Sequence, residues 1–176
     1  MGLMELLNVA GIVPLNPPRP IDWPNIEVEL SLSLPTDYKE LFTACGPGTF
    51  GGYIHLRNFA GNVKRYIENL AADFSIVEEG RGDVPEYFID IPFYPDDCGF
   101  FPWAFDDNGG MVGWLTAGDP NSWSVIAIDS ECTQYDRFDL NATEFLTRWL
   151  KNEISVSFYP EDVQPVGAPS FTRDSV

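Results

Sequence analysis

The chain has very little of the chemistry from which most active sites are built. His55 is its only histidine, and its three cysteines stand far apart without a C-x-x-C pair. A zinc site of cysteine and histidine would need all four of these distant residues, so we expect no metal site. No Walker loop occurs, and the G-x-G-x-x-G spacing of Gly46-Pro-Gly-Thr-Phe-Gly follows a predicted helix instead of a strand, which argues against a nucleotide cofactor. We therefore predict no catalytic residue and no cofactor.

Long apolar stretches are also absent. No segment approaches the ~20 apolar residues that a membrane-spanning helix needs. The first residues contain no basic region, and Glu5 interrupts their apolar run, so we expect no signal peptide. An odd number of widely spaced cysteines is typical of reduced thiols, and we predict a cytoplasmic protein.

Basic residues are scarce. The chain carries 10 lysines and arginines against 27 aspartates and glutamates, a formal net charge of −17. Between Glu78 and Asp139 there are 14 acidic residues, and only Arg81 and Arg137 oppose them, which leaves a net −12. Such a field repels nucleic acid and anionic membranes and attracts basic partners. The same acidity also serves solubility, and charge alone does not choose between the two roles.

Apolar and aromatic residues are plentiful. With 176 residues, 44% of them hydrophobic and 14% aromatic, the chain is long enough for one domain with a single core. Apolar residues at helical spacing predict helices over 23–30, 36–45 and 141–150, and another that starts at Asn62 and reaches Phe74. A short apolar segment over 3–10 precedes a proline-rich arm, and 78–86 is expected to be a charged loop.

Strand patterns fill the middle of the chain. We expect strands over 53–56, 87–91, 100–104, 111–116, 123–129 and 154–158. Asn108-Gly109 suits a tight hairpin between two of them, because such turns need positive φ values. The arrangement predicts one α+β domain with a mostly antiparallel sheet and helices packed against it. We place this domain at 21–160, between an N-terminal segment (1–20) and an irregular C-terminal tail (161–176).

Acidic turns punctuate these strands at Asp96, Asp97, Asp106, Asp107 and Asp119. Asp106-x-Asn108 begins like a calcium loop, but Met111 stands where its glycine should be and Ala117 where its bidentate glutamate should be. Capping of turns explains these aspartates better. A metal-dependent hydrolase remains the least favoured reading.

Tryptophans flank the same strands. Trp103, Trp114 and Trp123 suit the core, although one or two at a hairpin end could anchor a partner. Our hypothesis is that the five aspartates, with Trp114 and Trp123, form one acidic face that docks a basic protein such as a nuclease.

The order of the motifs is similar to that of a known family. Leu34-Pro-Thr-Asp-Tyr-Lys-Glu-Leu, followed by Cys45-Gly-Pro-Gly-Thr-Phe-Gly, resembles the start of the SUKH superfamily, which includes the Smi/Knr cell-wall-assembly regulators. Pro102-Trp103, Asp107-Asn-Gly, Trp114, Gly118-Asp-Pro, Trp123 and Glu144-Phe-Leu extend the likeness over roughly 20–160.

The resemblance implies an α+β domain without enzymatic activity. Many bacterial members are immunity proteins that bind and neutralise a secreted toxin, often a nuclease, and others are intracellular regulatory scaffolds, which is the alternative here. Partner-contacting residues vary within the family, so none is carried over. The matching residues Pro35, Tyr38, Gly46 and Trp103 are expected to serve packing and turns.

Overall fold

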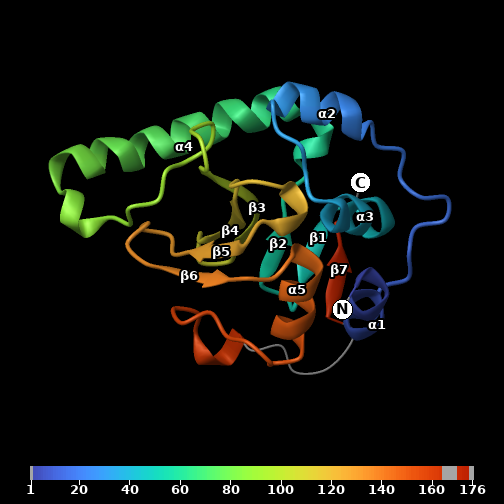
Figure 1. The fold of residues 1–176 in the computed structure, drawn as a ribbon. Helices are drawn as coiled ribbons and strands as arrows, with labels where there is room; N and C mark the ends of the chain where they lie inside the picture. The colour runs from blue at the N-terminus through green and yellow to red at the C-terminus, as the bar shows by residue number, and fades with distance from the viewer. Residues whose placement is uncertain (1, 164–169, 175–176) are drawn as a thin grey trace.

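The structure is a computed structural model that describes residues 2–163 and 170–174. In this part of the chain, helices and strands follow one another along a single α+β domain (Figure 1). The α-helices are α1 (Leu3–Ala10), α2 (Trp23–Leu30), α3 (Thr36–Cys45), α4 (Val63–Asp83) and α5 (Ala142–Leu150). The strands are β1 (Gly48–Phe50), β2 (Ile54–Leu56), β3 (Phe100–Asp106), β4 (Met111–Leu115), β5 (Val125–Ile128), β6 (Tyr135–Phe138) and β7 (Phe171–Arg173). Short 3-10 turns are η1 (Phe59–Gly61), η2 (Pro85–Tyr87), η3 (Pro120–Ser122) and η4 (Glu161–Val163).

The strands form one sheet in the order β6-β5-β4-β3-β2-β1-β7. Every neighbouring pair is antiparallel, and β3 to β6 form a meander in sequence order. The predicted fold class is confirmed, as is the hairpin at Asn108-Gly109, where Gly109 has a φ of 86°. Sequential hairpins need only short turns, which this chain marks with Asp, Asn and Gly.

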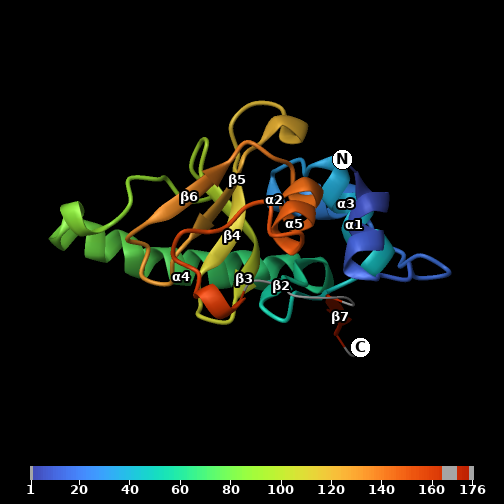
Figure 2. The same cartoon turned by 90° about the horizontal axis from the view of Figure 1, so that it is seen from below.

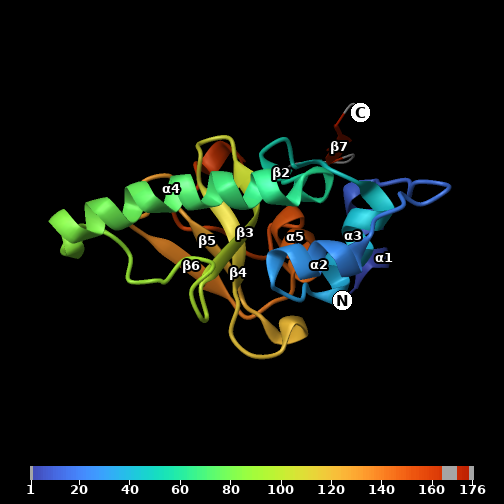
Figure 3. The same cartoon turned by 90° about the horizontal axis from the view of Figure 1, so that it is seen from above.

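Helices cover both faces of the sheet. Phe101, Trp114, Val125 and Phe138 are successive cross-strand partners and share one face, and Phe138 contacts Phe145 of α5 at 5.1 Å between ring centroids. Side chains alternate along a strand, so the preceding residue on β3 faces the other way. On that side α4 crosses the strands, and its C-terminal end projects beyond them (Figures 1 and 3).

Aromatic rings dominate the core. Trp103, Trp114 and Tyr38 have no exposed surface, and the ring of Tyr38 meets that of Trp114 edge-on at 5.0 Å. Fully burying one such ring stabilises the fold by about 1.5–3 kcal/mol. The expectation that most tryptophans serve the core is confirmed for Trp103 and Trp114.

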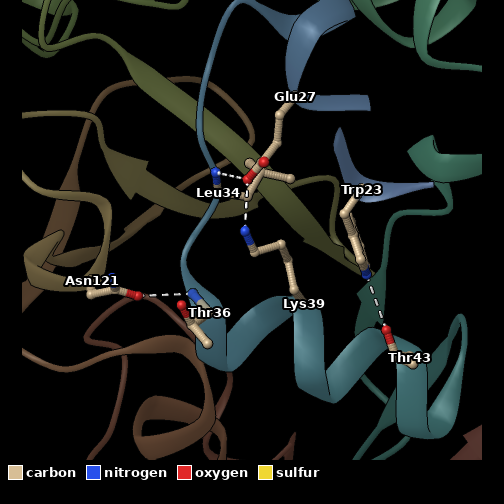
Figure 4. Close-up of polar contacts among 7 residues, drawn as sticks. All are labelled: Trp23, Glu27, Leu34, Thr36, Lys39, Thr43 and Asn121. Carbon is tan, nitrogen blue, oxygen red and sulfur yellow. Dashed lines mark hydrogen bonds and ion pairs between the residues drawn. The ribbon is translucent and has the colours of Figure 1, made fainter. Parts of the chain in front are cut away.

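Polar contacts fix α2 against α3 at the first of the family motifs (Figure 4). Glu27 Oε1 accepts hydrogen bonds from the Leu34 amide at 2.7 Å and from Lys39 Nζ at 2.8 Å. Trp23 Nε1 donates to Thr43 Oγ1 at 3.1 Å. Burial by itself raises the pKa of Glu27. The hydrogen bonds from Leu34 and Lys39, with the charge of Lys39, outweigh burial and lower the pKa overall.

A second contact ties this motif to the meander. The Thr36 amide, at the start of α3, donates to Asn121 Oδ1 at 2.9 Å (Figure 4). The first turn of a helix leaves amides without partners, and here a residue 85 positions away satisfies one. Family motifs far apart in the sequence therefore meet in space.

The helix α4 is longer than its apolar stripe predicts. It continues to Asp83, so the charged loop expected over 78–86 is wrong for most of its length. Arg81 explains the extension: its Nη2 donates to the carbonyl oxygens of Ile89 and Ile91 at 2.7 and 2.6 Å. Its guanidinium also lies 4.5 Å from the centroid of the Phe93 ring. Tertiary contacts thus hold a helix end that local propensity does not support.

Two predicted strands are wrong. The segment over 87–91 joins no named strand, and Ile89 and Ile91 are buried because they anchor this segment between α4 and the β5–β6 turn. The segment over 154–158 is also irregular. There the Ser157 amide donates to the Asp136 carboxylate instead of to a neighbouring strand. Alternating apolar residues predict burial correctly in both places but not the backbone pairing.

Three strands were not expected. β1 and β6 are short and carry glycine or charged residues, which mask the strand pattern. β7 lies in the supposed C-terminal tail and pairs with β1, so the expectation of an irregular tail is corrected there. Gly48 makes this pairing possible, because a Cβ at that position would lie 2.5 Å from the Thr172 carbonyl oxygen. Residues 164–169 of the expected tail lie outside the described residues.

No helix in the described part of the chain combines the length and the hydropathy that crossing a membrane requires.

Candidate functional site

The five aspartates of the hypothesised acidic face lie at two opposite ends of the sheet. Asp96 and Asp97 precede β3, and Asp119 follows the antiparallel β4, so these three share one end. Asp106 and Asp107 stand at the other end of β3. A strand of seven residues spans roughly 20 Å. The prediction of one continuous face through all five is therefore corrected.

Asp106 is an interior residue. Only 3% of it is exposed, and its Oδ1 accepts hydrogen bonds from the amides of Asn108 and Gly110 at 2.9 and 2.8 Å. The carboxylate therefore organises the β3–β4 hairpin, as expected for turn capping. Gly110 is needed beside it, because a Cβ there would lie 2.4 Å from Asp106 Oδ2.

The remaining aspartates of that set are exposed. Asp107 Oδ1 lies 2.5 Å from His55 Nε2, and Asp119 caps η3 by accepting from the Asn121 amide at 2.8 Å. Asp96 and Asp97 lie in the turn before β3. Their contribution to partner binding stays a prediction.

The two tryptophans of the hypothesis are not at the surface. Trp114 is fully buried and Trp123 is 5% exposed, with Trp123 Nε1 donating to the Gly118 carbonyl oxygen at 3.2 Å. Their rings pack on each other at 6.1 Å between centroids. Their place as surface anchors is corrected, because the interior of the meander needs their apolar area.

A different region gathers carboxylates and exposed apolar side chains. We call it the acidic end. It consists of the last part of α4 from Ile76, the segment over 84–90, and the β5–β6 turn around Asp129 and Glu131. Between 76 and 90 there are five acidic residues and one arginine, a net −4. This is the end of α4 that projects beyond the strands (Figures 2 and 3).

Exposed apolar surface accompanies this charge. Ile76, Val84 and Tyr87 are 71%, 47% and 54% exposed. Tyr87 Oη donates to Glu131 Oε2 at 3.1 Å, and the Ile89 amide donates to the Cys132 carbonyl oxygen at 2.9 Å. The three segments thus form one surface. Exposed aromatic and aliphatic groups rimmed by charge are typical of protein interfaces.

The two arginines between 78 and 139, Arg81 and Arg137, are both paired with acidic residues. Arg81 pairs with Glu78 at 2.5 Å and turns its remaining donors inward, as described above. Arg137 pairs with Asp139 at 3.1 Å and also donates to Ser124 Oγ at 2.9 Å. Both bases between 78 and 139 are therefore engaged by residues of that stretch, and most of its acidic residues are exposed to solvent.

The acidic end also violates a rule of helix stability. Glu78, Glu79 and Asp83 lie near the C-terminus of α4, where the helix dipole disfavours negative charge. Gly80 and Gly82 interrupt the same turns, although glycine lowers helix stability by about 1 kcal/mol relative to alanine. Local rules are broken most often at functional sites. This conflict favours a binding role for the acidic end over a purely structural one.

His55 belongs to a chain of polar contacts that resembles a catalytic relay. Thr49 Oγ1 lies 2.8 Å from His55 Nδ1, and Asp107 lies at the other ring nitrogen. However, β1 pairs with strands on both sides, so its backbone amides are committed to the sheet and cannot form an oxyanion hole. The His55 ring stacks on Phe105 at 4.9 Å. The arrangement is best explained as a cross-strand row on the face of the sheet.

Metal and thiol chemistry find little support. Among the described residues, no group of three or more His, Cys, Asp or Glu side chains is placed to hold a metal ion. Cys45 is buried, and burial raises its pKa to about 12. Burial likewise raises the pKa of Cys132 to about 11. Neither thiol is activated as a nucleophile.

Sequence reasoning missed the acidic end as a site. The acidic residues over 78–90 were visible, but 78–86 was predicted to be a charged loop and 87–91 a strand. One signal could have found it: Ile76, Val77 and Val84 stand among acidic residues beyond the predicted end of the helix.

Comparison with known proteins agrees with the geometry. A family model described as SMI1-KNR4 cell-wall (SUKH_6) matches residues 22–146. This range starts at the cap of α2 and ends within α5, so it contains α4 and the whole meander. No curated protein and no solved structure matches the chain.

Proposed function

The chain belongs to the SMI1-KNR4 family of the SUKH superfamily, and from this premise we propose that it is a non-enzymatic immunity protein. In this proposal it binds a basic toxin domain, such as a nuclease, and blocks the cleft that holds the phosphates of its substrate. Membership in the family supports an immunity or regulatory role, and the absence of an assembled catalytic constellation among the described residues is compatible with it.

The observation that carries the proposal is the acidic end. It projects from the domain, presents un-neutralised carboxylates, and adds Val84 and Tyr87 as exposed apolar groups. A nuclease cleft must be positive to hold phosphates, so an acidic protein can occupy it. Charge complementarity chiefly raises the association rate, while buried aromatic contacts slow dissociation.

The experiment tests the protein against the toxin domain of any secreted protein whose gene adjoins its own. Co-expression should rescue growth of cells that produce the toxin, and the purified pair should associate more slowly as salt is raised. If the protein instead binds a non-toxic partner of its own cell, the regulatory scaffold is the better function. If it binds the toxin without any dependence on salt, the acidic end is not the surface that docks.

A further inference from the structure

A cavity opens beside the acidic end, between two hairpin turns. Its volume is about 320 Å³, and it lies between the β3–β4 turn, the β5–β6 turn and the segment that precedes η4. Its walls include three carboxylates and three aromatic rings, from Asp106, Asp129, Glu131, Tyr53, Phe158 and Tyr159. Glu131 belongs to both the cavity and the acidic end, so the two are continuous.

No cation balances these carboxylates in the described part of the chain. Asp106 and Asp129 accept hydrogen bonds from neutral donors, namely amides and side chains of their own turns. Glu131 accepts from the hydroxyl of Tyr87. None of the three takes part in an ion pair between described residues. A buried carboxylate without a counter-ion is destabilising, and a cation entering the cavity would offset that penalty.

A second, independent feature points to the same kind of ligand. Tyr159 lines the cavity and is 9% exposed, and in the described part of the chain its hydroxyl has only the Asp106 carboxylate beside it, without a hydrogen bond of good geometry. Burial raises the pKa of Tyr159 far above its ordinary value, and the nearby charge of Asp106 raises it further. This hydroxyl therefore stays protonated. Buried polar groups without partners are rare in folded proteins.

The aromatic walls suit a flat cation. The rings of Tyr53 and Tyr159 meet edge-on at 4.9 Å between centroids. Tyrosine faces attract guanidinium groups, and a guanidinium also presents five donors in a fixed plane to carboxylates. A bare metal ion fits less well, because the described residues offer no cluster of three metal ligands.

We propose that this cavity receives an arginine side chain of the basic partner, which lies against Tyr53 and Tyr159 with its guanidinium at the carboxylates of Asp106, Asp129 and Glu131. The proposal rests on the proposed function, because it identifies the group through which the toxin is held. The cavity and the acidic end would contribute to binding in different ways. The acidic end steers the partner at a distance, whereas the cavity holds one side chain in a fixed orientation.

The test uses the full chain and needs no toxin. Nα-acetyl-arginine methylamide is titrated into ¹⁵N-labelled protein and followed by amide chemical shifts at constant salt. The amides of Asn108, Gly110, Thr133 and Gln134 are the reporters, because they donate to the carboxylates of Asp106 and Asp129. These four should shift together. The neutral isostere, Nα-acetyl-citrulline methylamide, should leave them unmoved.

Variants make the assignment specific. Asp106→Asn keeps an oxygen for the hairpin amides and removes the charge, so the apparent affinity for arginine should fall by at least about 10-fold. Asp119→Asn at the opposite end of the sheet removes the same charge and should leave the affinity unchanged. If Asp106→Asn does not fold, Glu131→Gln at the exposed rim should weaken binding in the same direction.

Three outcomes would overturn the proposal: equal shifts with citrulline, shifts outside these turns only, or full affinity in both cavity variants. Failure of the proposed function is separately visible. If the protein binds arginine in this cavity but protects no cell from a toxin, the proposed arginine site stands and the proposed immunity function is wrong.

Discussion

Arg81 Nη2 donates a hydrogen bond to the carbonyl oxygen of Ile91 at 2.6 Å, although the two residues belong to a helix and to an irregular segment ten positions later. This contact joins the projecting end of α4 to the segment that leads into the meander. The acidic end keeps its shape because of it, and the first prediction concerns its removal.

Replacing Arg81 by methionine keeps the aliphatic length and removes every donor. The carbonyl oxygens of Ile89 and Ile91 then lose a charged partner, which is expected to lower the free energy of unfolding by about 2–3 kcal/mol. Hydrogen exchange should accelerate over 76–91. Arg65→Met, at the exposed start of the same helix, is the matched control, and equal effects of the two variants would refute the role assigned to Arg81.

Two glycines of α4 should respond in opposite directions to alanine. A Cβ on Gly80 would lie 2.6 Å from the Phe88 ring, whereas a Cβ on Gly82 meets nothing within 4 Å. Gly82→Ala should therefore stabilise the protein by about 0.5–1 kcal/mol, and Gly80→Ala should destabilise it by about 1 kcal/mol or more. Urea denaturation measures both. A stabilised Gly80→Ala variant would contradict the packing of Phe88 on the helix.

Glu27 should make the protein sensitive to acid. Its pKa in the folded state is lower than the ordinary 4.5, so its stabilisation is complete above pH 4.5 and is lost as the pH falls through the folded value. Glu27→Gln should lower the free energy of unfolding by about 1 kcal/mol at pH 7, or roughly 2–4 °C in Tm. The difference from the parent protein should shrink below pH 4.5.

Glu29→Gln on the same helix is the control for this change. Glu29 accepts from the exposed Asn25 side chain, whereas the Leu34 amide and Lys39 donate to Glu27. Its substitution should leave the acid limb of the stability curve in place. A Glu27 difference that persists unchanged at pH 3 would mean that charge does not contribute to the contact.

The acidic end should govern the rate at which a basic toxin associates. The triple variant Glu79→Gln, Asp83→Asn and Glu86→Gln removes three exposed charges, and we expect association to slow about 10-fold at low salt. Stopped-flow fluorescence over a salt series measures this rate. The effect should vanish at high salt because screening shortens the reach of each charge.

The matched control removes three charges elsewhere. The control variant carries Asp96→Asn, Asp97→Asn and Asp119→Asn, at the end of the sheet opposite the β5–β6 turn. If this variant slows association as much as the first, overall charge and not the acidic end steers the partner. If it alone slows association, the sequence-based hypothesis about these three aspartates is the better one.

Much of the fold could be predicted from the sequence because its signals are local. Asp22 accepts from the Asn25 amide at the start of α2, and Asn141 with Glu144 forms the capping box of α5. Asn108-Gly109 marks the hairpin of the meander. Each depends on residues within three or four positions of one another, and such contacts form wherever the chain brings them together.

For the candidate site, the sequence predicted only the sign of its charge. The acidic excess over 78–139 is visible in the composition, and most of these residues are exposed. The sequence does not show that the aspartates are divided between two ends of the sheet. The antiparallel pairing of β3 and β4 places Asp106 and Asp119 at opposite ends. Trp114 likewise reads as an anchor or as core until the neighbouring strands bury it.

The sequence by itself therefore determined the α+β class, the family, the helix caps and the surplus of negative charge, since these follow from neighbouring residues and composition. Only the tertiary structure decided where α4 ends, that residues 171–173 complete the sheet beside β1, and which carboxylates share a cavity with Tyr159. The reason is physical. Pairing of Gly48 with Arg173, or of Arg81 with Ile91, depends on the closure of loops whose ends carry no mark of each other in the sequence.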